Sequence, residues 1–374
     1  MRIGVPKEIR AGEARVGLAP DVIAKLIKQG LEIVVESGAG VASGYPDEQY
    51  QKAGANIKSG NVISDSDIVA SVTALTVDQM KSLKKGAVTI SFLSPTTQVD
   101  SIEAAASAGV TAFSMELIPR ISRAQSMDAL TSQALCAGYR ASLVAADLSP
   151  RFFPMLMTAA GTVTPAQVVV LGAGVAGLQA IATAKRLGAV VSAYDVRPAS
   201  ADEVKSMGAT FIELELESLE GSGGYAREMT EERAAKQREL LKPYITKSNV
   251  IITTAAVPGR PAPRLVTKEM MSDLAPGSVI IDLASETGGN VEGSVAGETI
   301  TTETGVIIWG GKDVPSSLPF HASSLFSRNV VNLLTLITKP AADGNPVSLN
   351  IDFEDEIVKV SVLAHDGVKQ GASA

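Results

Sequence analysis

Short apolar runs alternate with amphipathic stretches over the first third of the chain. The apolar runs are rich in β-branched residues and bounded by Gly, Pro, Ser or Asp, which is typical of β-strands. The expected strands span residues 2–5, 31–37, 67–72, 87–93 and 110–115. Between them lie helical patterns such as residues 20–30, which begin near Pro20 and end at Gly30. Strands that alternate with helices predict a mostly parallel sheet with helices on both faces.

The same alternation restarts after Pro165. A strand, the turn GAGVAG, a helix and a second strand are expected in succession, and further strands come later in the chain. These segments are residues 167–171, 172–177, 178–188 and 189–195, followed by strands at 210–216, 249–255, 278–284 and 305–310. Ser200 and Glu203 have the spacing of a capping box that opens the next helix. We therefore predict two doubly wound, parallel-sheet, Rossmann-like α/β domains flanking a cleft.

The length of 374 residues also suggests two domains, because single hydrophobic cores rarely extend beyond about 250–300 residues. The amphipathic run 323–339 predicts a helix that leaves the second domain, and residues 347–363 predict short strands or a hairpin that returns to the first. The predicted first domain comprises residues 1–132 plus 322–374 and carries a polar loop at 119–128, and the second comprises residues 133–321.

Composition narrows the classes of function. Aromatic residues make up 4% of the chain, the formal net charge is −7, and lysines and arginines are scattered rather than grouped in a stripe. The sequence therefore predicts no nucleic-acid partner. One cysteine and two histidines form a poor set of metal ligands, so we predict no metal site. The cysteine, Cys136, is expected to be a small buried residue of a helix.

Targeting and membrane segments are not evident in the sequence. The N-terminal residues, MRIGVPKEIR, lack the apolar core of a signal peptide. Residues 152–184 carry no charge, but prolines, glycines and polar residues interrupt them well short of the roughly 20 apolar residues that cross a bilayer. We expect a soluble, cytoplasmic chain.

The turn GAGVAG has the spacing of a dinucleotide-binding fingerprint, and it lies between an apolar strand and a helix. Gly172 permits the tight turn, Gly174 lets the backbone approach a pyrophosphate, and Gly177 allows close packing of helix on strand. Val175 and Ala176 open the helix, whose free N–H groups and dipole favour an anion. These five residues are predicted to bind the cofactor.

Asp195 stands at the end of the next predicted strand. Its carboxylate is expected to accept hydrogen bonds from the adenine ribose and to repel a 2′-phosphate, which favours NAD(H) over NADP(H). Arg197 is a residue type that can accommodate such a phosphate, but the carboxylate normally decides. Val196, between the two, is also predicted to contact the cofactor. The alternative role for Asp195 is a turn or helix cap unconnected with a ligand.

Groups for acid–base chemistry are scarce. A dehydrogenase of small amino or hydroxy acids needs an acid or base, usually His or Lys, beside the nicotinamide. Neither His321 nor His365 follows a predicted strand. We expect His321 to be a helix cap or an interdomain residue, and His365 a surface residue of the C-terminal tail. Direct hydride transfer between two nicotinamides, in contrast, requires only that the two rings be aligned.

Several motifs resemble the alanine dehydrogenase and transhydrogenase α-subunit superfamily, namely RIGVPKE, ARVGLAP, VESGAG and GAGVAGLQAIATAKRLGA. Others are similar, more narrowly, to the NAD(H)-binding domain I of proton-translocating NAD(P)+ transhydrogenases. These are PRISRAQSMDALTSQ, SGGYAREM, TTAAVPGRPAP and GSVIIDLASETGGN. The likeness covers essentially the whole chain. It implies that this chain binds NAD(H) and that a partner subunit binds NADP(H).

The resemblance implies particular site residues. Arg120, Gln125 and Asp128 would line the nicotinamide and face the NADP(H)-binding subunit, with Gln125 bridging toward the second nucleotide. Further nucleotide contacts are implied for Ile121, Ser122, Ser126, Met127, Gly224, Tyr225, Gln237 and Ala256. A Gly/Ser-rich segment with one aromatic residue, such as that around Tyr225, is suited to a lid.

Simpler roles are open for each of these segments. The polar loop 119–128 could be a solvated connection between a strand and a helix, and the segment 217–229 could be a passive surface loop. Gln237 could be a solvated helix residue, and Ala256 a packing residue at a strand end.

The departures from alanine dehydrogenase bear on the chemistry. Ser71 and Ser94 stand where the resemblance places that family's catalytic lysine and histidine, which argues against amino-acid deamination. Arg15 stands at the position of the arginine that binds the substrate carboxylate, and a structural ion pair is its alternative role. Two other functions stay open: an alanine-dehydrogenase-like enzyme with an unusual acid or base, and a non-catalytic NAD(H)-binding module.

The resemblance also implies partners and a location. It implies a homodimer and a separate transmembrane subunit that forms the proton channel. The chain would then be cytoplasmic and peripheral to the inner (plasma) membrane, attached through its partner subunits. The sequence ends at KQGASA without a linker into a membrane segment, which fits a split-subunit arrangement.

Overall fold

Both predicted sheets are present in the structure, a computed structural model that describes residues 1–216, 230–256, 260–341 and 346–370. The chain divides into two units. The first comprises Met1–Gln133 and Pro315–Ala374, and the second comprises Ala134–Val314. Each unit has its own buried apolar core.

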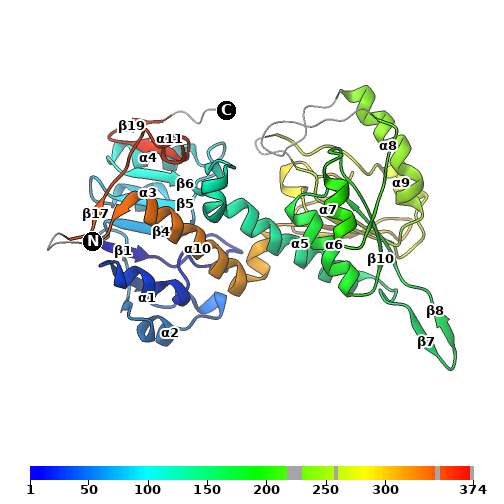
Figure 1. Ribbon diagram of the computed structural model, residues 1–374, viewed down its shortest axis with the longest axis horizontal. Coiled ribbons are helices and arrows are strands. Elements are labelled where there is room, and N and C mark those ends of the chain that lie inside the picture. The colour runs from blue at the N-terminus through cyan, green and yellow to red at the C-terminus, as the bar shows by residue number, and fades with distance from the viewer. Residues whose placement is uncertain (217–229, 257–259, 342–345, 371–374) are drawn as a thin grey trace. The chain divides into compact units, whose positions relative to one another are not determined.

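An eight-stranded sheet forms the centre of the first unit, in the order β19-β18-β6-β5-β4-β1-β2-β3 (Figure 1). Its parallel strands are β1 (Arg2–Val5), β2 (Glu32–Glu36), β3 (Asn56–Lys58), β4 (Ile68–Thr73), β5 (Val88–Phe92) and β6 (Thr111–Ser114). Because β1 lies inside the sheet and the chain winds outward to both sides of it, the order is doubly wound. At the β6 edge, β18 (Val362–His365) and β19 (Val368–Lys369) extend the sheet in antiparallel fashion.

The helices of the first unit start and end at the punctuation seen in the sequence. They are α1 (Pro20–Lys28), α2 (Asp47–Lys52), α3 (Val77–Lys81), α4 (Val99–Ser107), α10 (Pro319–Ile337) and α11 (Glu356–Ser361). Pro20 occupies the first turn of α1, and Gly30 follows its end at a φ of 93°. A short antiparallel pair, β16 (Thr338–Lys339) and β17 (Ser348–Leu349), follows α10.

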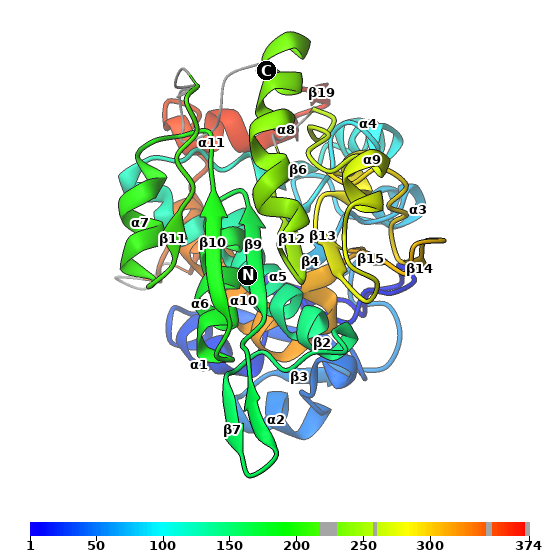
Figure 2. The same ribbon diagram turned by 90° about the vertical axis from the view of Figure 1, so that its right-hand side faces the viewer.

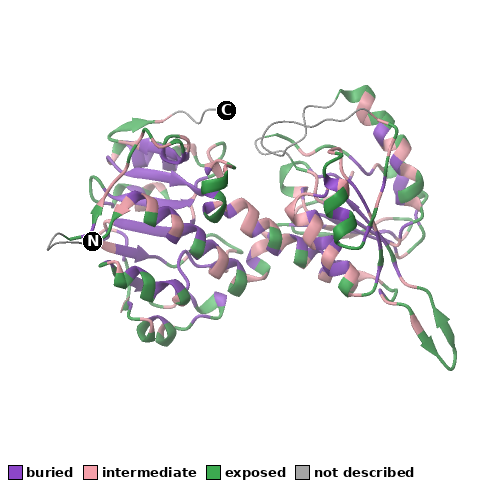
Figure 3. Ribbon diagram, in the orientation of Figure 1, coloured by how far each residue is buried: buried purple, intermediate pink, exposed green. Residues whose placement is uncertain are grey.

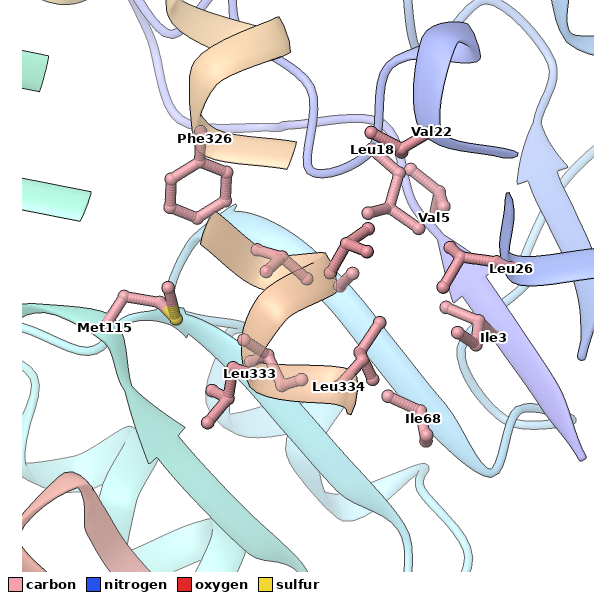
Figure 4. Packing of buried hydrophobic residues seen from close by; sticks show 14 of the residues in the cluster. Ile3, Val5, Leu18, Val22, Leu26, Ile68, Met115, Phe326, Leu333 and Leu334 are labelled. Carbon is pink, nitrogen blue, oxygen red and sulfur yellow. The ribbon is translucent and has the colours of Figure 1, made fainter. Parts of the chain in front are cut away.

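Helix α10 supplies much of the core of the first unit (Figure 4). Phe326, Leu333 and Leu334 project from it and are fully buried, in one cluster with Ile3 of β1 and Ile68 of β4. Burial of an apolar side chain of this size stabilises the fold by about 1.5–3 kcal/mol. This packing explains why the amphipathic run near residue 330 forms a helix that belongs to the first unit.

A seven-stranded sheet forms the second unit, in the order β11-β10-β9-β12-β13-β15-β14 (Figure 2). The strands are β9 (Gln167–Leu171), β10 (Val190–Tyr194), β11 (Thr210–Phe211), β12 (Val250–Thr253), β13 (Val279–Asp282), β14 (Thr299–Thr301) and β15 (Ile307–Gly310). All pairs are parallel except β14 with β15. The prediction of two doubly wound sheets is therefore confirmed.

The helices of the second unit are α6 (Val175–Arg186), α7 (Ser200–Ser206), α8 (Glu231–Thr246) and α9 (Lys268–Ser272). Helix α5 (Ala129–Leu148) begins in the first unit and continues into the second. Cys136 is buried within α5, as expected. A separate hairpin, β7 (Leu156–Thr158) with β8 (Gly161–Val163), is exposed, whereas the central strands of both sheets are buried (Figure 3).

Several local predictions were wrong. Ser200 is the first residue of α7 rather than its N-cap, and no side-chain capping bond forms there. Residues 356–361 form helix α11 instead of a strand, because Asp355 caps the backbone N–H of Ile357 and a helix buries Ile357 and Val358 on one face. The strand expected at 210–216 is limited to two residues.

His365 is not a tail residue, because it lies in β18. Its Nδ1 is 2.9 Å from Thr111 Oγ1, and its ring centroid is 4.5 Å from that of Phe353. His321 is exposed in the first turn of α10, edge-on to Phe320, and Leu318 rather than His321 is the N-cap of that helix.

Candidate functional site

The glycine-rich turn of the second unit links β9 to α6. Gly172 has a φ of 103°, a left-handed conformation that favours glycine. A β-carbon on Gly177 would lie 1.9 Å from the carbonyl oxygen of Gly172, so only glycine lets α6 approach the turn this closely. At Gly174, the N-cap of α6, a β-carbon would have no atom within 4 Å. The turn is thus closed on the side of the protein and open at Gly174.

This open side is the start of the twelve-residue helix α6. The first N–H groups of a helix have no partner within the helix, and the helix dipole places partial positive charge there. Val175 and Ala176 are half-buried in this first turn. The arrangement fits a pyrophosphate, which needs N–H donors and close approach of the backbone.

Asp195, immediately after β10, is held against this turn. Its Oδ2 accepts a hydrogen bond from the backbone N–H of Ala173 at 2.7 Å. Its other oxygen accepts bonds from the backbone N–H and Nε of Arg197, both at 2.9 Å. The guanidinium therefore folds back onto the carboxylate. Val196 packs its side chain against the core of the second unit, so only its backbone is available to a ligand.

A buried polar network shapes the end of β12, beside the glycine turn. Thr254 Oγ1 donates to the carbonyl oxygen of Gly172 at 3.0 Å. Next to it, the fully buried Asn290 accepts from the N–H of Ala255 and donates to its carbonyl oxygen, at 3.1 and 2.8 Å. Asp282, also fully buried, accepts from the N–H of Asn290 at 3.3 Å. These bonds fix the segment that carries Ala256, whose residue is exposed.

Sequence reasoning assigned no role to Thr254, Asp282 or Asn290. A signal was present, because Asp282 ends an otherwise apolar strand and a buried carboxylate requires several hydrogen-bond donors. Such a cluster at the carboxyl ends of parallel strands indicates a shaped site.

Gln237 is not the solvated helix residue that pattern alone allowed. It is 2% exposed in α8, and its Oε1 has no hydrogen-bond partner among the described residues. A buried amide oxygen without a donor costs free energy, so a bound ligand that donates to it would be stabilised. Gly224 and Tyr225 lie outside the described residues.

The polar loop of the first unit is a short 3-10 helix, Ser122–Met127, between β6 and α5. Ala124 and Met127 are buried, whereas Ser122, Gln125 and Ser126 are exposed. Ile121 is half-buried against the core. Only the exposed residues, together with the backbone, can therefore present groups to a nucleotide.

The backbone of this loop is fastened from below. Arg123 donates two hydrogen bonds to Asp355, at 2.9 and 2.8 Å. The side-chain amides of Asn329 and Asn332, both on α10, donate to the carbonyl oxygen of Ser126 at 2.9 and 3.0 Å. Gln125 thus projects from a fixed backbone.

Asp128 and Arg120 are neighbours at the two ends of the loop. Asp128 caps α5 by accepting from the N–H and Oγ1 of Thr131, at 2.9 and 2.7 Å. Arg120 Nε lies 3.8 Å from Asp128 Oδ2, and its side chain is 35% exposed. A guanidinium and a carboxylate side by side offer both donors and acceptors, which is what a carboxamide requires.

The first unit lacks the acid and base of alanine dehydrogenase at the expected places. Ser71 is buried and donates to the carbonyl oxygen of Thr73 at 2.8 Å. Ser94 has a left-handed backbone with a φ of 47°. A hydroxyl is a poor proton acceptor at neutral pH, so neither residue replaces a lysine or histidine. Arg15 is engaged in a bidentate ion pair with Glu13, with both N–O distances at 2.7 Å.

Within the described ranges, no group of three or more His, Cys, Asp or Glu residues is placed to hold a metal ion. No helix in the described segments is long and apolar enough to span a bilayer.

Comparison with known proteins gives matches over both units. The family described as Alanine dehydrogenase/PNT, N-terminal domain, matches residues 4–137, and its C-terminal domain matches residues 141–370. The chain is 47% identical to the first portion of NAD(P) transhydrogenase subunit alpha of Rhodospirillum rubrum, a separate chain, over 98% of this chain and 97% of that protein. It is 44% identical to NAD(P) transhydrogenase subunit alpha of Haemophilus influenzae, over 98% and 71% of the two chains. Alanine dehydrogenase of Bacillus subtilis is 29% identical over 98% and 94%.

Solved structures agree with this picture. The crystal structure of transhydrogenase from Sinorhizobium meliloti superposes with a TM-score of 0.89 at 44% identity, covering 99% of this chain and all of that one. An L-alanine dehydrogenase structure superposes with a TM-score of 0.79 at 23% identity, which supports the fold alone.

Proposed function

Because the chain belongs to the alanine dehydrogenase/PNT family and its transhydrogenase relatives share more identity with it than its alanine dehydrogenase relatives, we propose that it is the NAD(H)-binding subunit of a proton-translocating NAD(P)+ transhydrogenase. Hydride passes directly between NADH on this chain and NADP+ on a partner subunit. A transmembrane subunit couples this exchange to proton movement. Two copies of this chain form a homodimer that is cytoplasmic and peripheral to the membrane through its partners.

The geometry around Gly174 is the single observation that carries NAD(H) binding. Gly174 leaves open space at a helix N-terminus, and Asp195 is fixed beside it by the N–H of Ala173. We expect the pyrophosphate at the first turn of α6 and the adenine ribose at Asp195. Arg197 is paired with Asp195, so the carboxylate faces the ribose and favours NAD(H). Gln237 Oε1 and the backbone near Ala256 supply further contacts.

When bound, NADH supplies the hydride. The residues of this chain need only align the two rings, because no proton is exchanged with the protein in the transfer. Arg120 and Asp128 fix the carboxamide of the nicotinamide, and the exposed Gln125 reaches toward the second nucleotide. The anchored backbone below Gln125 supports this role, since a positioning residue must itself be held in place. Ser71 and Ser94 leave no acid or base for amino-acid deamination.

The partners follow from the relatives. Those most similar are named as subunit alpha of NAD(P) transhydrogenase, or as one portion of that subunit, which implies further chains. The partner that holds NADP(H) would face the exposed side of the polar loop.

Isotope transfer tests the proposal. NADH carrying deuterium at C4 is mixed with this chain and an NADP+-loaded partner domain, and the mass of the NADPH formed is measured. We expect the deuterium in NADPH, without exchange with water. Tight NADH binding without transfer would instead favour a non-catalytic binding module. Robust NADH oxidation by this chain alone with pyruvate and ammonia would favour an alanine-dehydrogenase-like enzyme.

A further inference from the structure

A buried ion pair in the first unit has partners far apart in the sequence. The Glu13 side chain is fully buried and that of Arg15 is 7% exposed. The third nitrogen of the guanidinium, Nη1, donates to Gln133 Oε1 at 2.8 Å, and Ser316 Oγ donates to Glu13 Oε1 at 2.6 Å. These four residues, Glu13, Arg15, Gln133 and Ser316, are called the crossing cluster below.

The last two residues of the crossing cluster mark the places where the chain passes between the units. Gln133 is the final residue of the first unit before the chain enters the second, and Ser316 follows Pro315, where the chain returns. One ion pair therefore holds both passages from the side of the first unit. Since charge-assisted bonds are stronger than neutral ones, this is a firm attachment.

The two helices at these passages are also joined directly. Gln133 Nε2, on α5, donates to the carbonyl oxygen of Ala322 on α10 at 3.1 Å. Ser132 Oγ donates to Asn329 Oδ1 at 2.7 Å. The same Asn329 donates to Ser126, in the polar loop. The crossing cluster and the polar loop thus share a support.

On the side of the second unit the chain is held again within a few residues. A β-carbon on Gly138 would lie 2.0 Å from the carbonyl oxygen of Ala176, so α5 lies closely against α6 there. Along the returning chain, Gly311 N–H donates to Asp282 O at 2.8 Å, and Asp313 N–H donates to Glu286 at 3.0 Å. The segments between the two sets of anchors are residues 134–137 and 314–315.

We propose that the crossing cluster is a positioning device that locks both passages into one block of the first unit. Motion between the units is then confined to residues 134–137 and 314–315, and the polar loop keeps its place with respect to both passages. The locking is a property of the fold. Its consequence for hydride transfer rests on the proposed function.

Amide hydrogen exchange of the full chain, followed by mass spectrometry, tests the locking without nucleotide or partner. Glu13→Gln should speed exchange about tenfold or more in peptides covering 129–133 and 316–322 together, although they lie far apart in sequence. Asp67→Asn is the matched control, because Asp67 pairs with Lys84, away from both passages. It should leave both peptides unchanged. Faster exchange confined to the Glu13 loop would overturn the proposal.

Ser316→Ala provides a milder variant if Glu13→Gln fails to fold. It removes one bond to Glu13 and should speed exchange at both passages by a smaller factor, whereas Ser316→Thr keeps the hydroxyl and should match the wild type. A change at residues 316–322 alone in Ser316→Ala would show that the passages are not locked together.

The effect on transfer is a separate readout. Ser316→Ala should lower the rate of deuteride transfer to the partner while the Kd for NADH stays unchanged, because NADH binds in the second unit. Unchanged transfer together with coupled exchange would leave the locking in place and remove its proposed role in aligning the rings.

Discussion

Asp195 Oδ2 accepts a hydrogen bond from the backbone N–H of Ala173 at 2.7 Å, across the gap between the ends of β10 and β9. The bond joins the acidic residue after one strand to the glycine turn after the next. It fixes the distance between the expected ribose site and the expected pyrophosphate site, two portions of one dinucleotide. Arg197 on the other carboxylate oxygen keeps the Asp195 side chain oriented.

Replacing Asp195 by Asn should weaken NADH binding. The variant keeps the shape and one acceptor but loses the charge that holds the ribose, so the Kd should rise roughly ten- to hundredfold. Quenching of the single tryptophan, Trp309, or NADH fluorescence measures the Kd. Asp202→Asn, an exposed acidic residue of α7, serves as the control and should not change it. Equal Kd values for the two variants would contradict the assigned role.

Gly174 and Gly177 should respond differently to alanine. At Gly174 a β-carbon has open space, so Gly174→Ala should fold with a Tm near that of the wild type but lose NADH binding, because the methyl group occupies the approach of the pyrophosphate. At Gly177 a β-carbon collides with Gly172 O, so Gly177→Ala should cost about 1–3 kcal/mol of stability. Thermal unfolding and NADH titration separate the two. Normal NADH binding by Gly174→Ala would place the cofactor elsewhere.

Gln125→Asn should slow hydride transfer with little change in NADH affinity. Gln125 is exposed on an anchored backbone, and shortening it by one methylene withdraws its amide from the second nucleotide. Single-turnover transfer from deuterated NADH gives the rate, and a titration gives the Kd. Arg123→Gln is the companion variant, since it loosens the loop at Asp355 without shortening Gln125. A large loss of affinity with normal transfer would count against the bridging role.

Glu13 should make the protein sensitive to acid. Burial by itself raises the pKa of its carboxyl, but bonds from Arg15 and the charge of Arg15 outweigh burial and lower the pKa from 4.5 to about 2. The resulting stabilisation, on the order of 3 kcal/mol, is fully present above pH 4.5 and is lost as the pH falls toward 2. The difference in unfolding free energy between wild type and Glu13→Gln should therefore shrink over this range in urea titrations.

Glu8 provides a control of opposite sign. Burial raises the pKa of its carboxyl in spite of hydrogen bonds from Thr73 and Val72. Protonation of Glu8 is thus favoured in the folded state, so the wild type should gain stability relative to Glu8→Gln as the pH falls through this raised pKa. Parallel curves for the Glu13 and Glu8 variants would show that the two carboxyls are not in the environments described.

The sequence by itself determined the doubly wound sheets, the glycine turn and Asp195. These depend on short-range rules: β-branched runs between turn residues, Pro20 and Gly30 at the ends of a helix, and a glycine wherever backbone or helix must approach closely. The same rules misassigned residues 356–361, because six residues of mixed pattern are decided by their packing and by the cap at Asp355.

Only the tertiary structure decided which polar residues are buried together. Gln237 could have been a solvated helix residue by pattern, and its burial depends on the elements that α8 packs against. Arg15 could have been a ligand for a carboxylate, but folding brings Glu13, Gln133 and Ser316 into one cluster with its guanidinium from distant segments of the chain. Hydrogen bonds and ion pairs act over a few ångströms in space, and no spacing along the sequence specifies such distances until the two sheets have formed.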